Sequence, residues 1–204
     1  MKIRITRNRT IGTALLMATL ALVITSCQKT DIREPVNISD NTLAGTEDKL
    51  QWPDVPDSLQ VPAGNKLIMH AFASGVQIYK VTQSVIDPNV YTWVFVAPSA
   101  TLYYDEGYSF KIGMHYIGPT WETNSGSTVV GSVQVKSVQD VTAIPWLLLG
   151  GVSNSPTGFF KKVNYIQRLK TIGGLAPTTG ADADHLGQQD SIYYTADYYF
   201  YQPK

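Results

Sequence analysis

A histidine, a tryptophan and a glutamate bracket a turn in the middle of the chain. His115 precedes Gly118 and Pro119, and Trp121 and Glu122 follow them. An imidazole beside a carboxylate can transfer a proton, and an aromatic ring with a polar edge can bind a sugar or an apolar face. The same residues therefore suggest two functions, a cleft with an acid–base pair or an aromatic binding surface.

The glycine-containing turn at residues 124–127 predicts a hairpin that separates Trp121 and Glu122 onto opposite faces. In a regular hairpin Trp121 would face Val130 and Glu122 would face Val129, because side chains alternate along a strand. A register shift of one residue would reverse both assignments.

With that register, the polar face of the hairpin forms a candidate ligand site. It would contain His115, Trp121, Gln134 and Lys136. One flat ring with several hydrogen-bonding groups suits a polar, partly apolar ligand such as a glycan. The alternative is that Trp121 is simply a core residue, as large aromatic side chains usually are.

Glu122 would lie on the apolar face, where burial raises the pKa of a carboxyl unless a cation pairs with it. Arg168 stands in an apolar run and is the candidate partner, so we expect a structural ion pair between Glu122 and Arg168. The competing interpretation is a small hydrolase-like enzyme that uses a His115/Glu122 cleft. Because there is no G-x-S-x-G motif, a serine nucleophile is not favoured.

Composition excludes several classes of protein. The chain has 204 residues, of which 44% are hydrophobic and 16% charged, with 16 basic and 16 acidic residues. A neutral balance argues against a nucleic-acid partner. The three histidines, His70, His115 and His185, show no metal-ligand spacing, so we expect no metal and no cofactor.

Short β-branched and aromatic runs alternate with turn residues from residue 58 onward, which predicts an all-β fold. We expect an antiparallel β-sandwich or barrel of about eight strands, with a tight turn at Ser74 and Gly75. The predicted strands are 66–73, 76–83, 91–96, 108–116, 128–135, 144–149, 159–169 and 191–201. In the last of these, alternation places Tyr194, Tyr198 and Phe200 on one face, and Tyr193, Tyr199 and Tyr201 on the other.

The N-terminus resembles the signal peptide of a bacterial lipoprotein. Four basic residues fall within residues 1–9, an apolar run covers residues 11–24, and Thr25 and Ser26 precede Cys27, the sole cysteine. A membrane-spanning helix needs about 20 residues, and the apolar run is shorter than that. The lipobox resemblance implies that residues 1–26 are removed and that Cys27 is lipidated.

The domain organisation follows from a change in residue composition along the chain. Residues 27–57 are rich in proline and polar side chains and predict a flexible tether, although Trp52 can dock on the domain. Residues 58–204 form the predicted β domain. The membrane is then a partner through Cys27, and the expected location is the bacterial cell envelope, on its periplasmic or cell-surface face.

Several long motifs in the β domain resemble one known family. They are GVQIY (75–79), WVFVAP (93–98), GMHYIGPTWE (113–122), AIPWLLL (143–149), YIQRLKTIGGLAP (165–177) and YTADYYFY (194–201). In this order they are similar to DUF3455, a family of exported bacterial and fungal proteins of uncharacterised function. Relatives often carry a cysteine where this chain has Ala181, so a disulfide of those relatives is not implied here.

The residues and the resemblance together favour a non-catalytic function. We expect an envelope-anchored lipoprotein whose β domain is structural or binds a ligand, with a glycan or another cell-envelope molecule as the partner. The hydrolase-like enzyme remains the alternative, and the oligomeric state is left open.

Overall fold

The computed structural model describes residues 50–204, and eight strands make up most of this part of the chain. A short 3-10 helix, η2 (Asp57–Leu59), precedes them. The strands are β1 (Asn65–Gln83), β2 (Tyr91–Tyr103), β3 (Lys111–Tyr116), β4 (Thr120–Thr123), β5 (Thr128–Ser137), β6 (Trp146–Asn154), β7 (Tyr165–Gly173) and β8 (Gln189–Pro203). The predicted signal peptide, Cys27 and most of the predicted tether lie outside the described residues. No helix among residues 50–204 is long and apolar enough to cross a membrane.

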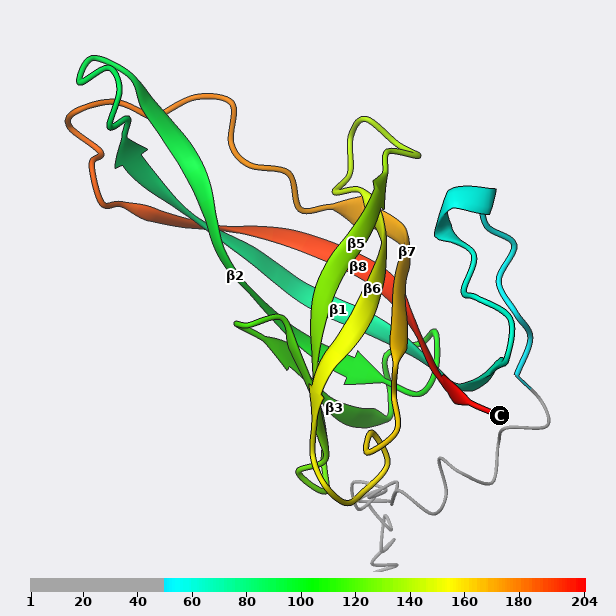
Figure 1. Ribbon diagram of the computed structural model, residues 1–204. Helices are drawn as coiled ribbons and strands as arrows, with labels where there is room; N and C mark the ends of the chain where they lie inside the picture. The colour runs from blue at the N-terminus through cyan, green and yellow to red at the C-terminus, as the bar shows by residue number, and fades with distance from the viewer. Residues whose placement is uncertain (1–49) are drawn as a thin grey trace, which may run out of the picture. The chain divides into compact units, whose positions relative to one another are not determined.

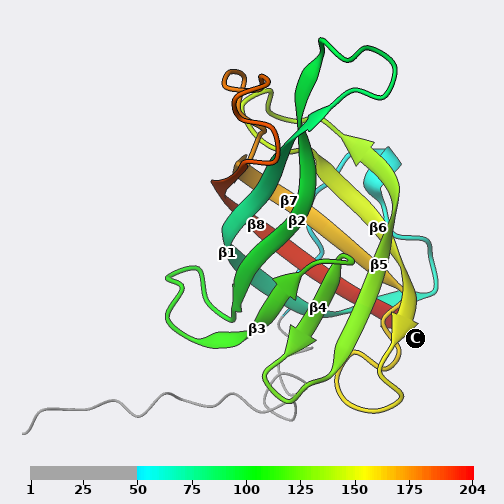
Figure 2. The same cartoon turned by 90° about the vertical axis from the view of Figure 1, so that its left-hand side faces the viewer.

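The strands close into an antiparallel barrel in which each one pairs with its neighbour in sequence and β8 pairs with β1. Figures 1 and 2 show the wall running from β1 round to β8, with β1 and β2 extending as a long hairpin. The all-β, antiparallel prediction is confirmed, and the arrangement is a barrel. Closure leaves no free sheet edge in the wall.

The predicted turn at Ser74 and Gly75 is wrong, because β1 continues through both residues. Gly75 pairs with Ala100 of β2 on one side and with Tyr194 of β8 on the other. A Cβ at this position would collide with the backbone of Ser99 and Ala100, so the glycine permits a close approach of two strands rather than a reversal. The two predicted strands 66–73 and 76–83 are one.

The predicted register of the β4–β5 hairpin is also wrong, by one residue. Thr123 N–H donates to Ser127 O, so the loop contains three residues and ends at Gly126 with φ +85°. A left-handed residue in the third position is typical of three-residue hairpins. Trp121 therefore pairs with Val129 rather than Val130, and the faces of the hairpin are exchanged relative to the prediction.

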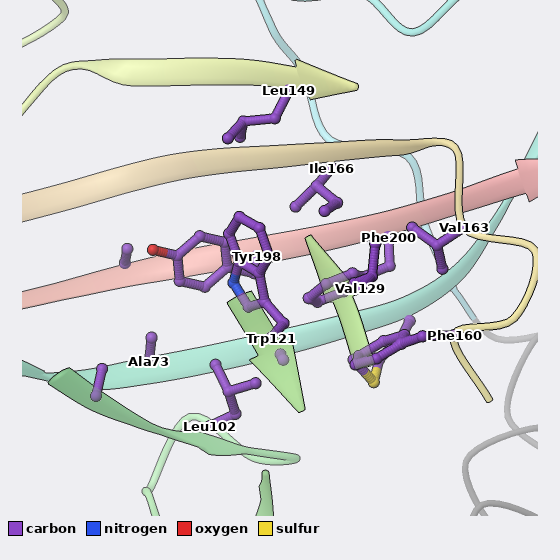
Figure 3. Close-up of a cluster of buried hydrophobic side chains, with 14 of the residues drawn as sticks. Ala73, Leu102, Trp121, Val129, Leu149, Phe160, Val163, Ile166, Tyr198 and Phe200 are labelled. Carbon is purple, nitrogen blue, oxygen red and sulfur yellow. The ribbon is translucent and has the colours of Figure 1, made fainter. Parts of the chain in front are cut away.

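Aromatic and aliphatic side chains fill one part of the barrel interior (Figure 3). Trp121 packs edge-on against Tyr198 and Phe200, and the ring of Phe160 stacks 4.8 Å from that of Phe200. Val129 and neighbouring aliphatic residues are buried around these rings. Figure 3 shows the Tyr198 hydroxyl pointing along the barrel, away from Phe160. The Tyr194 hydroxyl lies 3.5 Å from that of Tyr198.

A second apolar cluster covers the outer wall of the barrel. The segment before β1 lies against β1, β6, β7 and β8 and buries Leu59 completely. Gln167 Nε2 donates to Leu59 O at 2.7 Å, and Gln167 Oε1 accepts a hydrogen bond from the Tyr201 hydroxyl at 2.6 Å. The ring of Trp52 lies 4.9 Å from that of Tyr201. Residues 50–61 are thus part of the packed structure.

Candidate functional site

A pocket of about 340 Å³ opens inside the barrel and is lined by side chains from all eight strands. An eight-stranded barrel has an interior that is either just filled by side chains or holds one small ligand. Here the part occupied by Phe160 and Phe200 is filled, and the part beyond Trp121 and Tyr198 is open. The volume is at the small end of the range for ligand pockets.

Three aromatic rings form the inner end of the pocket. His115 and Trp121 are cross-strand partners, and their rings stack 4.3 Å apart with an interplanar angle of 10°. The ring of Tyr198 meets both at an angle, with centroids 5.1 and 5.3 Å away. Trp121 is only 1% exposed, so its indole is a wall of an interior pocket and not a platform on the surface.

His115 is held in one neutral form. Its Nδ1 lies 2.9 Å from Thr120 O, which can only accept, so Nδ1 carries the proton and Nε2 is an acceptor. Complete burial lowers the pKa of His115 to about 3. The hydrogen bond found for the imidazole among residues 50–204 is to that backbone oxygen, and no carboxylate orients it as a general base would require.

Two buried donors in the pocket have no hydrogen-bond partner. Gln77 is 2% exposed, and neither its Nε2 nor the Nε1 of Trp121 makes a well-formed hydrogen bond to a described residue, although the Tyr194 hydroxyl lies near the Gln77 amide. Both residues line the pocket. Native proteins rarely leave a buried donor without an acceptor, because no hydrogen bond then offsets the free-energy cost of removing the group from water. Such donors at a pocket wall point to an acceptor supplied from outside the chain.

Cationic and apolar side chains form the rest of the lining. Arg168 enters from β7, and its Nε and Nη2 donate to Pro145 O at 3.2 and 2.8 Å. Lys136 enters from β5. Burial raises the pKa of Tyr198, and the positive charge of Arg168 opposes that rise. Leu147, Leu149, Val133, Pro98, Val96 and Phe95 supply the apolar surface of the pocket.

Comparison with known proteins identifies the family of this barrel. Residues 62–202 match the model of DUF3455, which is described as a protein of unknown function. The chain belongs to the DUF3455 family. No curated protein and no solved structure matches it.

In this DUF3455 domain the predicted ion pair between Glu122 and Arg168 is wrong. Glu122 lies on the outer face of β4, where its Oε2 accepts a hydrogen bond from the Tyr116 hydroxyl at 2.7 Å. That bond raises the pKa of Tyr116. Arg168 faces the interior with Leu147 and Tyr198 as cross-strand partners. The two side chains are on opposite sides of the barrel wall because the β4–β5 register differs from the predicted one.

The predicted His115/Glu122 cleft is not formed, for the same reason. His115 and its partner Trp121 face the interior, whereas Glu122 follows Trp121 and faces outward. Neighbouring residues of a strand point to opposite faces. The acid–base pair that the hydrolase-like alternative requires is therefore separated by the sheet itself.

The structure brings together three of the four residues predicted to bind a ligand. His115, Trp121 and Lys136 all line the pocket of the DUF3455 domain. Gln134 does not, because a register shift between Val133 and Val135 makes it an extra residue in β5. Its exposed side chain lies on the outer face, against Gly150. The exposed patch predicted around Trp121 is wrong, although His115, Trp121 and Lys136 do share a face.

Sequence reasoning missed Gln77, Tyr198 and the interior position of Arg168. Gln77 lies two residues after Gly75 and two before Tyr79, so it shares the buried face of β1 with Ala73. The available signal is a polar residue at one of the alternate strand positions whose side chains are otherwise buried. The predicted turn at Gly75 concealed this signal by dividing that strand.

Within residues 50–204, no group of three or more metal-ligating side chains is found.

Proposed function

We propose that this DUF3455 domain is a non-catalytic binding module that takes one small, largely apolar molecule into the barrel. The observation that carries the proposal is a pocket inside the barrel whose wall contains two buried donors, Gln77 Nε2 and Trp121 Nε1, without acceptors. Phe95, Val96 and Leu147 supply apolar surface for the remainder of the molecule. Ligand pockets typically combine such an apolar lining with a few placed polar groups.

An exposed tryptophan would favour a glycan as the ligand. Trp121 is 1% exposed, however, and one side of the pocket is lined by apolar residues such as Val133, Leu147 and Leu149. A sugar carries a hydroxyl on nearly every carbon, and each would need a partner once buried. A molecule with one polar end fits this pocket better.

The pocket can be tested with a neutral fluorescent probe, N-phenyl-1-naphthylamine, and the purified protein. Val133 lines the pocket, so Val133→Trp should fill it and weaken binding of the probe at least about tenfold. Val138→Trp is the matched control, because Val138 is 66% exposed and lies just beyond β5, outside the pocket. Equal binding by wild type and Val133→Trp, or binding by neither, would count against the proposal.

Anchoring at the cell envelope is the second part of the proposed function. It rests on the lipobox resemblance at Thr25, Ser26 and Cys27, residues outside those that the structure describes. Several acyl chains on one residue hold a protein firmly, at about 0.8 kcal/mol per buried CH₂. Cys27→Ser should abolish labelling by a clickable palmitate analogue and release the protein from membranes. Persistent acyl labelling of that variant would overturn the anchor.

A further inference from the structure

Hydrogen-bond donors outnumber acceptors in the barrel pocket. Arg168 and Lys136 bring two cations to its wall, and no aspartate or glutamate among residues 50–204 lines it. Gln77 Nε2 and Trp121 Nε1 add two neutral donors without acceptors. The pocket therefore lacks anionic oxygen atoms, which a ligand can supply.

Arg168 is positioned but not neutralised. Its Nε and Nη2 donate to Pro145 O, which fixes the plane of the guanidinium, yet a backbone carbonyl carries no net charge. A guanidinium has five N–H donors, so this oxygen does not use them all. None of the ion pairs found within the described part of the chain includes Arg168. A half-buried cation without a counter-ion is costly, and pairing it with an anion relieves that cost.

The acids that could have neutralised this cation are engaged on the outer wall. Glu122 accepts from Tyr116 there. Asp197 pairs with His70 at 3.0 Å and with Lys170 at 3.2 Å, also on the outer face of β8. The His115 imidazole is neutral, because burial lowers its pKa to about 3, so it adds no charge to the pocket. The two cations thus face a pocket with no compensating charge from the described residues.

We propose that the ligand of this pocket is an apolar monocarboxylate whose carboxylate is held by Arg168, with Lys136 as the outer cation. The assignment rests on the proposed binding function. A carboxylate has two oxygens that only accept, which matches an arginine fork and the unpartnered donors of Gln77 and Trp121. An alcohol could donate to His115 Nε2 but would leave Arg168 without a counter-ion, and an amine would bring a third cation. The hydrocarbon part lies along Leu147, Leu149 and Phe95.

The test compares matched ligands by displacement of N-phenyl-1-naphthylamine from the full-length protein. Decanoate is compared with 1-decanol, and 3-phenylpropionate with 3-phenylpropanol, so that each pair differs only at the polar end. The acid of at least one pair should displace the probe at concentrations about tenfold lower than its alcohol. Equal displacement by acid and alcohol in both pairs, or none by either acid, overturns the assignment. Probe binding that is lost in Val133→Trp would still support the binding function.

Variants locate the carboxylate within the pocket. Arg168→Gln keeps a donor for Pro145 O but removes the charge, and it should reduce the acid-to-alcohol preference to about one. Lys136→Gln, at an exposed position, should reduce the preference by a smaller factor. Lys80→Gln is the control, because Lys80 is an exposed cation on the outer face of β1. A preference that survives unchanged in Arg168→Gln overturns the assignment. Acid and alcohol are compared within each variant, so absolute affinities need not be compared between variants.

Discussion

At the scale of single residues, the inner end of the pocket depends on a histidine that stays neutral. Its Nδ1–H satisfies Thr120 O, and its ring supports the face of Trp121. Burial rather than a neighbouring charge is the main cause of its low pKa, with the cation of Arg168 adding to it. His115 is thus a structural group of the pocket wall whose remaining polar atom, Nε2, accepts.

The low pKa of His115 predicts a definite dependence of stability on pH. In the unfolded chain a histidine takes up its proton near pH 6.5, whereas in the folded protein His115 does so near pH 3. Between these values the unfolded state binds one more proton. The free energy of unfolding should therefore fall by up to about 1.4 kcal/mol per pH unit as the solution is acidified.

Urea denaturation across this pH range measures the effect. His115→Gln retains an N–H donor but cannot titrate. Its free energy of unfolding should therefore change less steeply with pH than that of the wild type, by a difference that corresponds to about one proton. Identical slopes for the two proteins would show that His115 is protonated in the folded state as easily as in the unfolded chain.

At the scale of elements, the three-residue loop between β4 and β5 decides which side chains enter the barrel. Thr123 and Ser127 close the loop, and Gly126 ends it with φ +85°. Glycine adopts this conformation without strain, whereas a residue with a Cβ does not. A loop one residue longer would turn Trp121 outward and Glu122 inward, with the loss of the pocket wall.

Substitution of Gly126 tests this dependence. A Cβ there would meet only Glu122 Oε1, at 4.0 Å, so a cost would come from backbone conformation and not from a clash. Gly126→Ala should lower the free energy of unfolding by about 1–2 kcal/mol. Gly126→Asn should cost less, because asparagine tolerates the left-handed region. Equal costs in chemical denaturation would contradict the assigned loop conformation.

At the scale of the whole domain, the barrel is stabilised from outside as well as inside. Residues 50–61 precede the span matched by the family model, yet Leu59 is completely buried against the outer wall. Gln167 joins the two parts through Leu59 O and the Tyr201 hydroxyl. The packed unit of this chain therefore begins before the first residue of the family match.

Truncation of Leu59 measures how much this outer packing contributes. Leu59→Ala should destabilise the protein by about 2–5 kcal/mol, as expected for a buried leucine. Leu186→Ala is the control, because Leu186 is 55% exposed and should cost no more than about 0.5 kcal/mol. Similar melting temperatures for Leu59→Ala and the wild type would mean that the segment contributes little to stability.

The sequence by itself determined the fold class, the family and much of the alternation within strands. Period-2 runs separated by turn residues predicted an antiparallel all-β domain, which the eight-stranded barrel confirms. In β8 the predicted separation of Tyr198 and Phe200 from Tyr199 and Tyr201 matches the inner and outer clusters. Alternation is a local property of an extended backbone, so it can be read from the sequence without knowing the partners.

Only the tertiary structure decided which face became the interior and what that interior contains. Alternation grouped His115 with Trp121 correctly, but the side they occupy depends on a loop that is one residue shorter than predicted. The shift between Val133 and Val135 excluded Gln134, and the partners of Arg168 follow from the pairing of β7 with β6 and β8. These outcomes depend on register and closure, and a displacement of one residue exchanges the two faces of a strand.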